Sequence, residues 1–349
     1  MIGNVPPADA SKDLVCMSKA IATEEELIQD YLCPLAAGFS GAFGLKDDCA
    51  AIKVPPGNEL IVTTDALVSG IHFLPDETPE NIAWRALAVN VSDLAAKGAS
   101  PLYYLMALSL PEVPEAEWMM RFSSALKDAQ DHYSMHLIGG DTDRRTGVPL
   151  SVTITAMGTV PDGKMVRRSK ARLGDRIFVS GTLGDAGLGL ALRRNRDGRR
   201  SWPIDKADRQ FLVDRYLRPT PRLELSPLLL AYATAAMDLS DGLAKDLDRL
   251  LRASGVGARI SFDQLPRSPA AARVFADSPD LANLPLNGGD DYEVLATVPA
   301  ASADAFEDAA LEAGIAVTDI GEITKAAGLV IVGADGTPIT LDKTGYDHF

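Results

Sequence analysis

Strand-like and helix-like segments alternate through both halves of this 349-residue chain, and that alternation restricts the fold more than any other feature. Short apolar, β-branched runs predict strands at 50–54, 59–64, 102–110, 136–141, 151–160, 175–180, 235–239, 258–262 and 293–298, and near Val317 and Leu329. Helical spacing predicts one helix that begins at Thr23 and another that ends at Leu192. It also predicts helices at 78–98, 116–133, 222–232, 242–253 and 302–313. A turn-rich stretch, Val160 to Gly163, separates the halves. We predict a mixed α/β (α+β) fold with two domains, residues 1–165 and 166–349.

The charge balance and the cysteines exclude several classes of function. A net charge of −14 disfavours nucleic acid as a partner. Cys16, Cys33 and Cys49 are unevenly spaced and lack a histidine cluster, which fits neither a disulfide framework nor a zinc site. No apolar run reaches the ~18 residues of a spanning helix, and Asp9 and Asp13 interrupt any secretory-signal pattern. We expect a cytoplasmic protein with no membrane partner.

Aspartates recur where a predicted strand ends or a turn begins. Taken singly, each motif is more often a helix cap or a turn former than a functional site. Several carboxylates from different segments are also what a site for more than one Mg²⁺ ion requires, because Mg²⁺ binds oxygen ligands together with substrate phosphates. The motifs are Asp47-Asp48, Thr63-Thr64-Asp65, Asn90 to Asp93, Gly139-Gly140-Asp141, Asp238-Leu239-Ser240-Asp241 and Gly289-Asp290-Asp291.

Three of these motifs favour metal and phosphate chemistry for local reasons. Asn90 and Asp93 interrupt an apolar helical run, where a bound cation would explain them, although a solvent-exposed helix face explains them equally well. Residues 238–242 form a strand-to-helix turn, whose backbone N–H groups suit a phosphate. The glycines of 139–140 permit close approach of a phosphate, with a plain turn as the alternative.

Familiar nucleotide-binding motifs are missing from the sequence. It contains neither GxxxxGK[ST] nor the glycine-rich loop, HRD and DFG set of protein kinases. Gly181 to Gly189 is glycine-rich but does not have the GxGxxG spacing, so NAD is not expected.

The motifs together resemble the thiamine-monophosphate kinase family, which lies in a superfamily with aminoimidazole ribonucleotide synthetase, selenophosphate synthetase and a hydrogenase maturation protein. The resemblance spans most of the chain. The motifs shared across the superfamily are residues 47–50 (DDCA), 63–68 (TTDALV), 86–98 (ALAVNVSDLAAKG), 137–142 (LIGGDT), 237–243 (MDLSDGL) and 288–293 (GGDDYE). Residues 70–73 (GIHF) and 345–349 (GYDHF) are typical of the thiamine-phosphate branch.

The resemblance implies ATP-dependent phosphorylation of thiamine monophosphate to thiamine diphosphate with release of ADP, the last step of thiamine diphosphate biosynthesis. Transfer would be direct and in line, with several Mg²⁺ ions and no covalent nucleophile. It also implies an aminoimidazole ribonucleotide synthetase-like fold, in which the N-terminal domain binds ATP and metal and pairs its sheet with a partner's in a homodimer, while the C-terminal domain completes the site. By position, the metal ligands are Asp48, Thr63, Thr64, Asp65, Asp93, Asp141, Asp238 and Asp241, the ATP contacts are Gly140, Asp141, Arg168 and Ser240, and the substrate contacts are His72, Asp290 and Tyr346.

Two residues differ from the family pattern, and three alternative functions are weighed against it. Lys46 stands where the family usually has Gly, and Asp290 stands where it usually has Glu. A selenophosphate synthetase would need a reactive Cys in an N-terminal glycine-rich loop, and the hydrogenase maturation branch would need a C-terminal Cys; the sequence has neither. A nucleotide-binding sensor without turnover is the third rival, and the intact aspartates argue against it.

Overall fold

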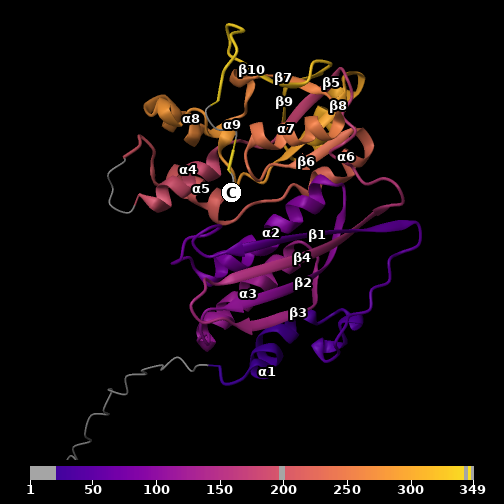
Figure 1. The fold of residues 1–349 in the computed structure, drawn as a ribbon, viewed down its shortest axis with the longest axis vertical. Coiled ribbons are helices and arrows are strands. Elements are labelled where there is room, and N and C mark those ends of the chain that lie inside the picture. The colour runs from indigo at the N-terminus through magenta and orange to yellow at the C-terminus, as the bar shows by residue number, and fades with distance from the viewer. Residues whose placement is uncertain (1–20, 196–200, 342–344, 347–349) are drawn as a thin grey trace, which may run out of the picture.

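The computed structural model describes residues 21–195, 201–341 and 345–346, and divides them between two β-sheets (Figure 1). The first half of the chain, indigo to magenta in Figure 1, builds a four-stranded sheet, and the second half builds a six-stranded sheet. The predicted mixed α/β class with two domains is confirmed. The predicted boundary between residues 165 and 166 stays a prediction. None of the helices in the described part of the chain is long and apolar enough to cross a membrane.

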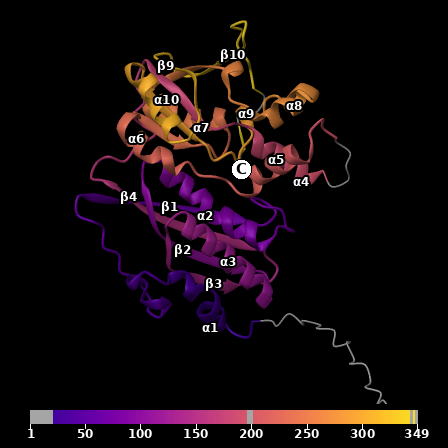
Figure 2. The same cartoon turned by 180° about the vertical axis from the view of Figure 1, so that it is seen from behind.

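The four-stranded sheet has the order β1-β4-β2-β3, with β2 and β3 parallel and the other neighbours antiparallel. Helices α2 and α3 cover one face of this sheet (Figure 2). Large side chains of these helices, such as Leu87, Leu94, Met119 and Phe122, fill the space between the helices and the sheet. The bounds are α1 Glu24–Leu27, β1 Asn58–Val68, α2 Pro79–Ala96, β2 Ser100–Leu110, α3 Ala116–His132, β3 His136–Arg144 and β4 Ser151–Pro161.

The six-stranded sheet has the order β10-β7-β9-β5-β8-β6 and is buried on both faces. Alternate residues of β5 show this, because Ile177 and Val179 pack in the core that contains α7, whereas Phe178 packs with Phe306 and Leu229 of α10 and α6 on the other face. The bounds are β5 Asp175–Ser180, α4 Asp185–Arg194, α5 Lys206–Leu217, α6 Ser226–Tyr232, β6 Ala235–Asp238, α7 Leu243–Ser254, β7 Gly257–Ser261, α8 Pro269–Asp277, α9 Leu284–Asn287, β8 Val294–Pro299, α10 Ala303–Glu312, β9 Val317–Thr324 and β10 Gly328–Val332.

Helix α2 joins the two halves and begins and ends as its sequence dictates. Thr78 caps its first turn by accepting a hydrogen bond from the Asn81 amide at 3.4 Å, and Pro79 occupies the first turn, where no amide donor is needed. After its last residue, Gly98 takes a φ of +73°, and a Cβ there would lie 2.6 Å from Leu230 of α6. Helix α2 therefore ends against the C-terminal half, which brings its polar residues to the junction of the two sheets.

One predicted strand is wrong, and three helices, α5, α8 and the single-turn α9, were not predicted. Residues 50–54 form no strand; the Ala51 amide bonds instead to the Gly41 carbonyl, and Ala50 and Ile52 pack against β2 and β3. Helices α5 and α8 have charged or short apolar patterns, although Asp205 and Ser268 cap them recognisably. Together with α4, these helices surround a small separate core at the edge of the larger sheet.

Candidate functional site

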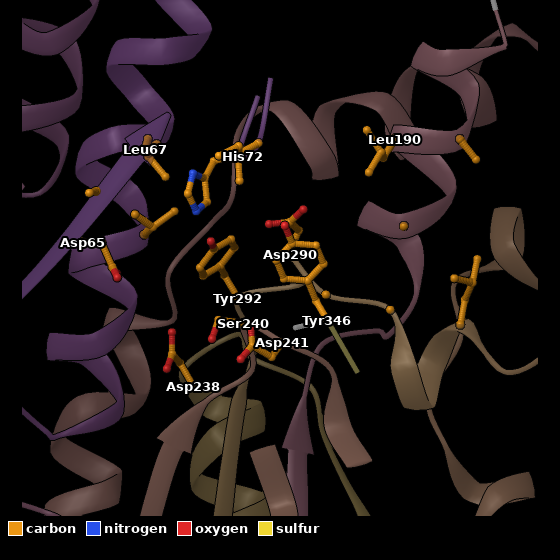
Figure 3. Close-up of a pocket in the computed structure, with 18 of the residues that line it drawn as sticks. Asp65, Leu67, His72, Leu190, Asp238, Ser240, Asp241, Asp290, Tyr292 and Tyr346 are labelled. Atoms are coloured by element: carbon orange, nitrogen blue, oxygen red, sulfur yellow. The ribbon is translucent and has the colours of Figure 1, made fainter. Parts of the chain in front are cut away.

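Most of the predicted site residues divide between two cavities, and Thr63, Thr64 and Arg168 line neither of them. The larger, which we call the central pocket, has a volume of about 750 Å³ and lies where α2 and β1 meet the loops of the larger sheet (Figure 3). Asp65, His72, Asp93, Asp238, Ser240, Asp241, Asp290 and Tyr346 line it. The second cavity, of about 640 Å³, lies at the β3 side of the smaller sheet and is lined by Asp48, Gly140 and Asp141. One chain therefore does not bring all of the predicted ligands together.

The acidic wall of the central pocket is built by β1 and α2. The Thr63 hydroxyl donates to Asp93 Oδ2 at 2.5 Å, and the Asp65 amide donates to Asn90 Oδ1 at 3.0 Å. Asn90 is fully buried, and its side-chain amide also donates to the Ala86 carbonyl, so a solvent-exposed helix face does not explain it. Thr64 points the other way, because the strand alternates, and bonds to Thr155 at 3.1 Å. Thr63 and Thr64 therefore cannot serve the same cavity of one chain.

The opposite wall is the turn between β6 and α7. Gly242 allows the turn with a φ of +114°, and Asp238 lies at the strand end with Ser240 and Asp241 behind it. We expected the backbone amides of this turn to suit a phosphate, but the amides of Ser240 and Asp241 both donate to Asp246 Oδ2, at 3.1 and 2.9 Å. The buried Asp246 side chain thus occupies the anion position itself.

Crowded carboxylates dominate the electrostatics of the pocket. Burial, followed by the neighbouring charges of Asp93 and Asp241, raises the pKa of Asp65 to about 6. Burial, followed by Asp93 and Asp246, raises the pKa of Asp238 well above its usual value. The cluster carries more negative charge than its surroundings neutralise, so a cation bound between these side chains would be strongly favoured.

The acidic wall fits Mg²⁺ as one part of a larger ligand set. Over residues 21–195, 201–341 and 345–346, no three His, Cys, Asp or Glu side chains converge into a site that would hold a metal by themselves. Mg²⁺ commonly uses one or two carboxylates and completes its shell with waters and substrate phosphates, so the donor set fits an ion that arrives with a nucleotide. Asp241 is already paired with Arg249 at 2.7 Å and with Lys245 at 3.5 Å, which makes it less available as a ligand than Asp65 or Asp238.

Two cations lie beside the acidic cluster. Lys97 is buried and donates to the Ala236 carbonyl at 2.8 Å. Burial lowers the pKa of Lys97 to about 8, with Asp238 acting against that effect and the charge of Arg168 adding to it. Arg168 is itself exposed, in the segment between the two sheets, and its carbonyl accepts a hydrogen bond from Ser254. The predicted ATP contact Arg168 is thus close enough to Lys97 to act on its charge.

The remaining part of the pocket is aromatic and apolar. Figure 3 shows His72, Tyr292, Asp290 and Tyr346 on one side, with Leu190 of α4 facing them. His72 Nδ1 accepts a hydrogen bond from the Val68 amide at 3.0 Å, which fixes the ring and, in its neutral form, leaves the proton on Nε2. The Tyr346 amide bonds to the Asp241 carbonyl at 3.0 Å, so the C-terminal segment is joined to the β6–α7 turn. Residues 347–349 of the predicted terminal motif lie outside the described residues.

Gly140 has a packing role in the second cavity. A Cβ at Gly140 would lie 1.8 Å from the Met106 carbonyl oxygen of β2, so a side chain cannot fit there. That close approach explains the glycine without a phosphate. Asp48 follows the short helical segment 40–45 and is exposed at the mouth of the cavity.

Three residues at the central pocket were missed by sequence reasoning. Arg85 is a buried cation on α2, Tyr292 lines the pocket, and Asp246 holds the turn amides. The signal for Arg85 was present, since an arginine inside the apolar run 82–91 needs a buried partner. Asp246 had no such signal, because an acidic residue in the first turn of a helix is ordinary.

Comparison with known protein families matches both halves of the chain. The AIR synthase related protein N-terminal domain matches residues 46–160, and the C-terminal domain of the same family matches residues 172–333. Thiamine-monophosphate kinases of Salmonella typhimurium and Escherichia coli K12 are each 45% identical over 307 residues, 88% of this chain and 91% of the relative.

Solved structures agree with these matches. A thiamine-monophosphate kinase from Stenotrophomonas maltophilia K279a has a TM-score of 0.80 at 38% identity, and the alignment covers 92% of this chain and 100% of that one. A structure described as AaThiL complexed with AMPPCP and TMP has a TM-score of 0.72 at 32% identity, covering 93% and 97%. The hydrogenase maturation protein HypE of E. coli, at 22% identity and a TM-score of 0.74, shares the fold.

Proposed function

This chain belongs to the thiamine-monophosphate kinase family, and from that premise we propose that it transfers the γ-phosphoryl group of ATP to the phosphate of thiamine monophosphate. The products are thiamine diphosphate and ADP, and the reaction is the last step of thiamine diphosphate biosynthesis. The observation that carries the proposal is the central pocket, which joins a wall of crowded carboxylates to an aromatic end within one cavity. A cytoplasmic location remains a prediction.

The acidic wall suits the phosphate end of the reaction. Asp65 and Asp93 of this wall would hold Mg²⁺ ions together with Asp238 of the opposite wall, and Thr63 fixes the direction of the Asp93 carboxylate through its 2.5 Å hydrogen bond. When bound, Mg²⁺ neutralises charge on the phosphates and aligns them. Each side chain here has a holding or orienting role, which is what phosphoryl transfer requires of a protein, and no covalent phosphoenzyme is proposed.

The aromatic end suits thiamine. Its cationic ring is attracted to a carboxylate and to aromatic faces, and Asp290, Tyr292 and Tyr346 all line this part of the cavity. His72 is held by the Val68 amide with its ring in the pocket, where its Nε2 proton can meet a substrate acceptor. We therefore keep His72, Asp290 and Tyr346 as substrate contacts.

The uncovered face of the smaller sheet supports the proposal of a homodimer. On the face of the smaller sheet away from α2, Leu60 and Val62 of β1 are 36% and 55% exposed, so a strand surface of apolar residues lies uncovered. Pairing this face with that of a second copy would bury those side chains. We propose that this pairing also brings Asp48, Thr64, Gly140 and Asp141 into contact with metal and nucleotide. Ser240 of the central pocket and Arg168 of the segment between the two sheets would contact the nucleotide with them.

The activity is tested by measuring ADP release from Mg-ATP with thiamine monophosphate, an aminoimidazole precursor or selenide as the acceptor. We expect release only with thiamine monophosphate, and a loss of about a thousandfold in Asp65→Asn, since that change removes a proposed metal ligand. Asp128→Asn, on an exposed part of α3, serves as the matched control and should behave as wild type. Turnover with another acceptor would overturn the substrate assignment, and full activity in Asp65→Asn would remove Asp65 from the metal site.

The dimer is tested by Val62→Asp, which places a charge on the exposed face of β1. Light scattering should show wild type at twice the chain mass and the variant as a monomer, because a buried unpaired carboxylate costs several kcal/mol. Val330→Asp, at a residue 43% exposed on β10 of the other sheet, is the control and should stay dimeric. A dimeric Val62→Asp protein would exclude this face as the interface.

A further inference from the structure

Arg85 connects the two halves of the molecule beneath the central pocket. It projects from α2, is 3% exposed, and donates from Nη1 to the Tyr216 carbonyl of α5 and from Nη2 to Asp290 Oδ1. Its guanidinium carbon lies 4.8 Å from the centre of the Tyr216 ring and 5.7 Å from that of Tyr292. Burial acts to lower the pKa of Arg85, but the charge of Asp290 and the neighbouring tyrosines outweigh it and the pKa is raised. The cation is therefore kept charged by a partner that itself lines the pocket.

The segment that carries this partner has an unusual backbone. Asp290 and Tyr292 have φ values of +72° and +50°, in the left-handed region that residues other than glycine rarely adopt. Such conformations persist when surrounding contacts fix them. The Asp290 amide bonds to the Ser240 carbonyl, and the intervening Asp291 accepts hydrogen bonds from the amides of Gly184 and Ala186 at 2.7 and 3.3 Å. Arg85 adds a contact from the N-terminal half to these contacts from the C-terminal half.

Asp290 faces both Arg85 and the cavity. Its side chain is 30% exposed although its partner is almost completely buried, and Figure 3 shows it between His72 and Leu190, near Tyr346. A carboxylate tied through one oxygen to a buried guanidinium has few orientations available. The pair is neutral overall, so it removes the repulsion that an unpaired buried arginine would exert on a cationic ligand.

From this geometry we propose that Arg85 is a positioning residue for the substrate. It holds Asp290 in the orientation that receives the cationic ring of thiamine monophosphate, and Asp290 in turn masks the charge of Arg85. This inference rests on the proposed function. It predicts that the double variant binds the substrate more tightly than the variant of Asp290 alone, and a purely structural ion pair does not predict this. Loss of Asp290 alone exposes the substrate to an unmasked cation, and loss of both groups removes that penalty.

The test is a double-mutant cycle with Arg85→Gln, Asp290→Asn and both together, read as KM for thiamine monophosphate and for ATP and as direct binding of thiamine monophosphate by calorimetry. We expect Asp290→Asn to raise KM for thiamine monophosphate about 50-fold and Arg85→Gln about 10-fold. The double variant should return to about 10-fold, below Asp290→Asn alone. KM for ATP should change less than about twofold in all three. Arg85→Lys, which keeps the charge, should lie between wild type and Arg85→Gln.

Arg218→Gln is the matched control, because Arg218 also joins α2 to the end of α5, donating to Asn81 at 2.9 Å and lying 5.8 Å from the Trp84 ring centre, but does not line the central pocket. It should leave KM for thiamine monophosphate unchanged. If Arg85→Gln does not fold, Arg85→Met takes its place, and Arg85→Met/Asp290→Asn should bind thiamine monophosphate more tightly than Asp290→Asn alone, because the unmasked cation is again removed.

Two patterns would overturn the inference while leaving the proposed function intact. One is a double variant whose losses multiply, and the other is a folded Arg85→Gln protein whose KM values for both substrates match wild type. A wild-type protein without turnover of thiamine monophosphate would overturn the proposed function and this inference together. That outcome is distinguished from failure of the inference alone, because it is seen in the wild-type protein before any variant is measured.

Discussion

Asp238→Asn should lower kcat by about a thousandfold, equivalent to about 4 kcal/mol, while making the metal-free protein more stable at neutral pH. The first effect follows because Asp238 lines the central pocket opposite the acidic wall and is a proposed Mg²⁺ ligand. The second follows because burial, together with the charges of Asp93 and Asp246, raises the pKa of Asp238 well above its usual value. An amide of the same shape removes that repulsion, so activity and stability should change in opposite directions.

The raised pKa of Asp238 determines how the stability difference between wild type and Asp238→Asn changes with pH. A carboxyl whose pKa is raised on folding contributes stability below its unfolded value of 3.8, and that contribution is lost as pH rises through the folded pKa. The advantage of Asp238→Asn in Tm should therefore be absent near pH 4 and large at about pH 8. Mg-ATP should then stabilise wild type much more than the variant, since only wild type retains the proposed ligand.

Thermal unfolding from about pH 4 to about pH 8, with and without Mg-ATP, checks both effects, and kcat at the upper end of that range checks the activity. Asp248→Asn is the control, because this partly exposed aspartate of α7 pairs with Arg252 at 3.0 Å and does not line the central pocket. A loss of Tm at high pH in Asp238→Asn would show that its carboxylate stabilises the metal-free fold, contrary to the crowding argument.

Most of the fold could be predicted because local patterns and tertiary packing agree. Helix α2 has its cap, its proline and its terminal glycine in the sequence, and the structure places it at Pro79–Ala96 within the predicted 78–98. The predicted strand at 50–54 failed because a short apolar run does not tell ladder pairing from packing on another strand's side chains. Helix α5 was missed because half of its residues are charged or amide side chains and its buried positions, such as Leu212 and Tyr216, are few.

The site was predictable as a set of residue types but not as a geometry. Thr63 and Thr64 are adjacent in the sequence, yet strand alternation sends them to opposite faces of the sheet. The division of the aspartates between two cavities depends on which strand lies at which edge of the sheet, and no local pattern encodes that order. The pairing of Arg85 with Asp290 joins residues 205 positions apart and likewise requires the tertiary structure.

Glu293 anchors the segment that forms one wall of the central pocket. It is fully buried and pairs with two arginines, Arg215 at 2.7 Å and Arg222 at 2.5 Å, while the Ser180 hydroxyl donates to its Oε2 at 2.6 Å. A Cβ at Gly181 would lie 2.2 Å from Glu293 Oε1, so the surrounding backbone is closed tightly around this carboxylate. Removal of its charge would leave the buried Arg215 and the partly buried Arg222 without the carboxylate that both of them contact.

Glu293→Gln should therefore lower the free energy of unfolding by about 3–5 kcal/mol, the usual cost of removing one partner from a buried ion pair. For a chain with two cores of this size, we expect Tm to fall by roughly 10 °C, with loss of binding of thiamine monophosphate before global unfolding, because strand β8 begins directly after this residue. Glu80→Gln provides the matched control, since Glu80 pairs with Arg121 at 2.6 Å on the surface, where such a pair contributes about 1 kcal/mol or less. Chemical denaturation of both variants, at a pH where the wild-type protein is most stable, measures the difference. Equal losses in the two variants would mean that burial does not strengthen the Glu293 network, and that the pocket wall is held instead by the backbone contacts of Asp290 and Tyr292 to the β6–α7 turn.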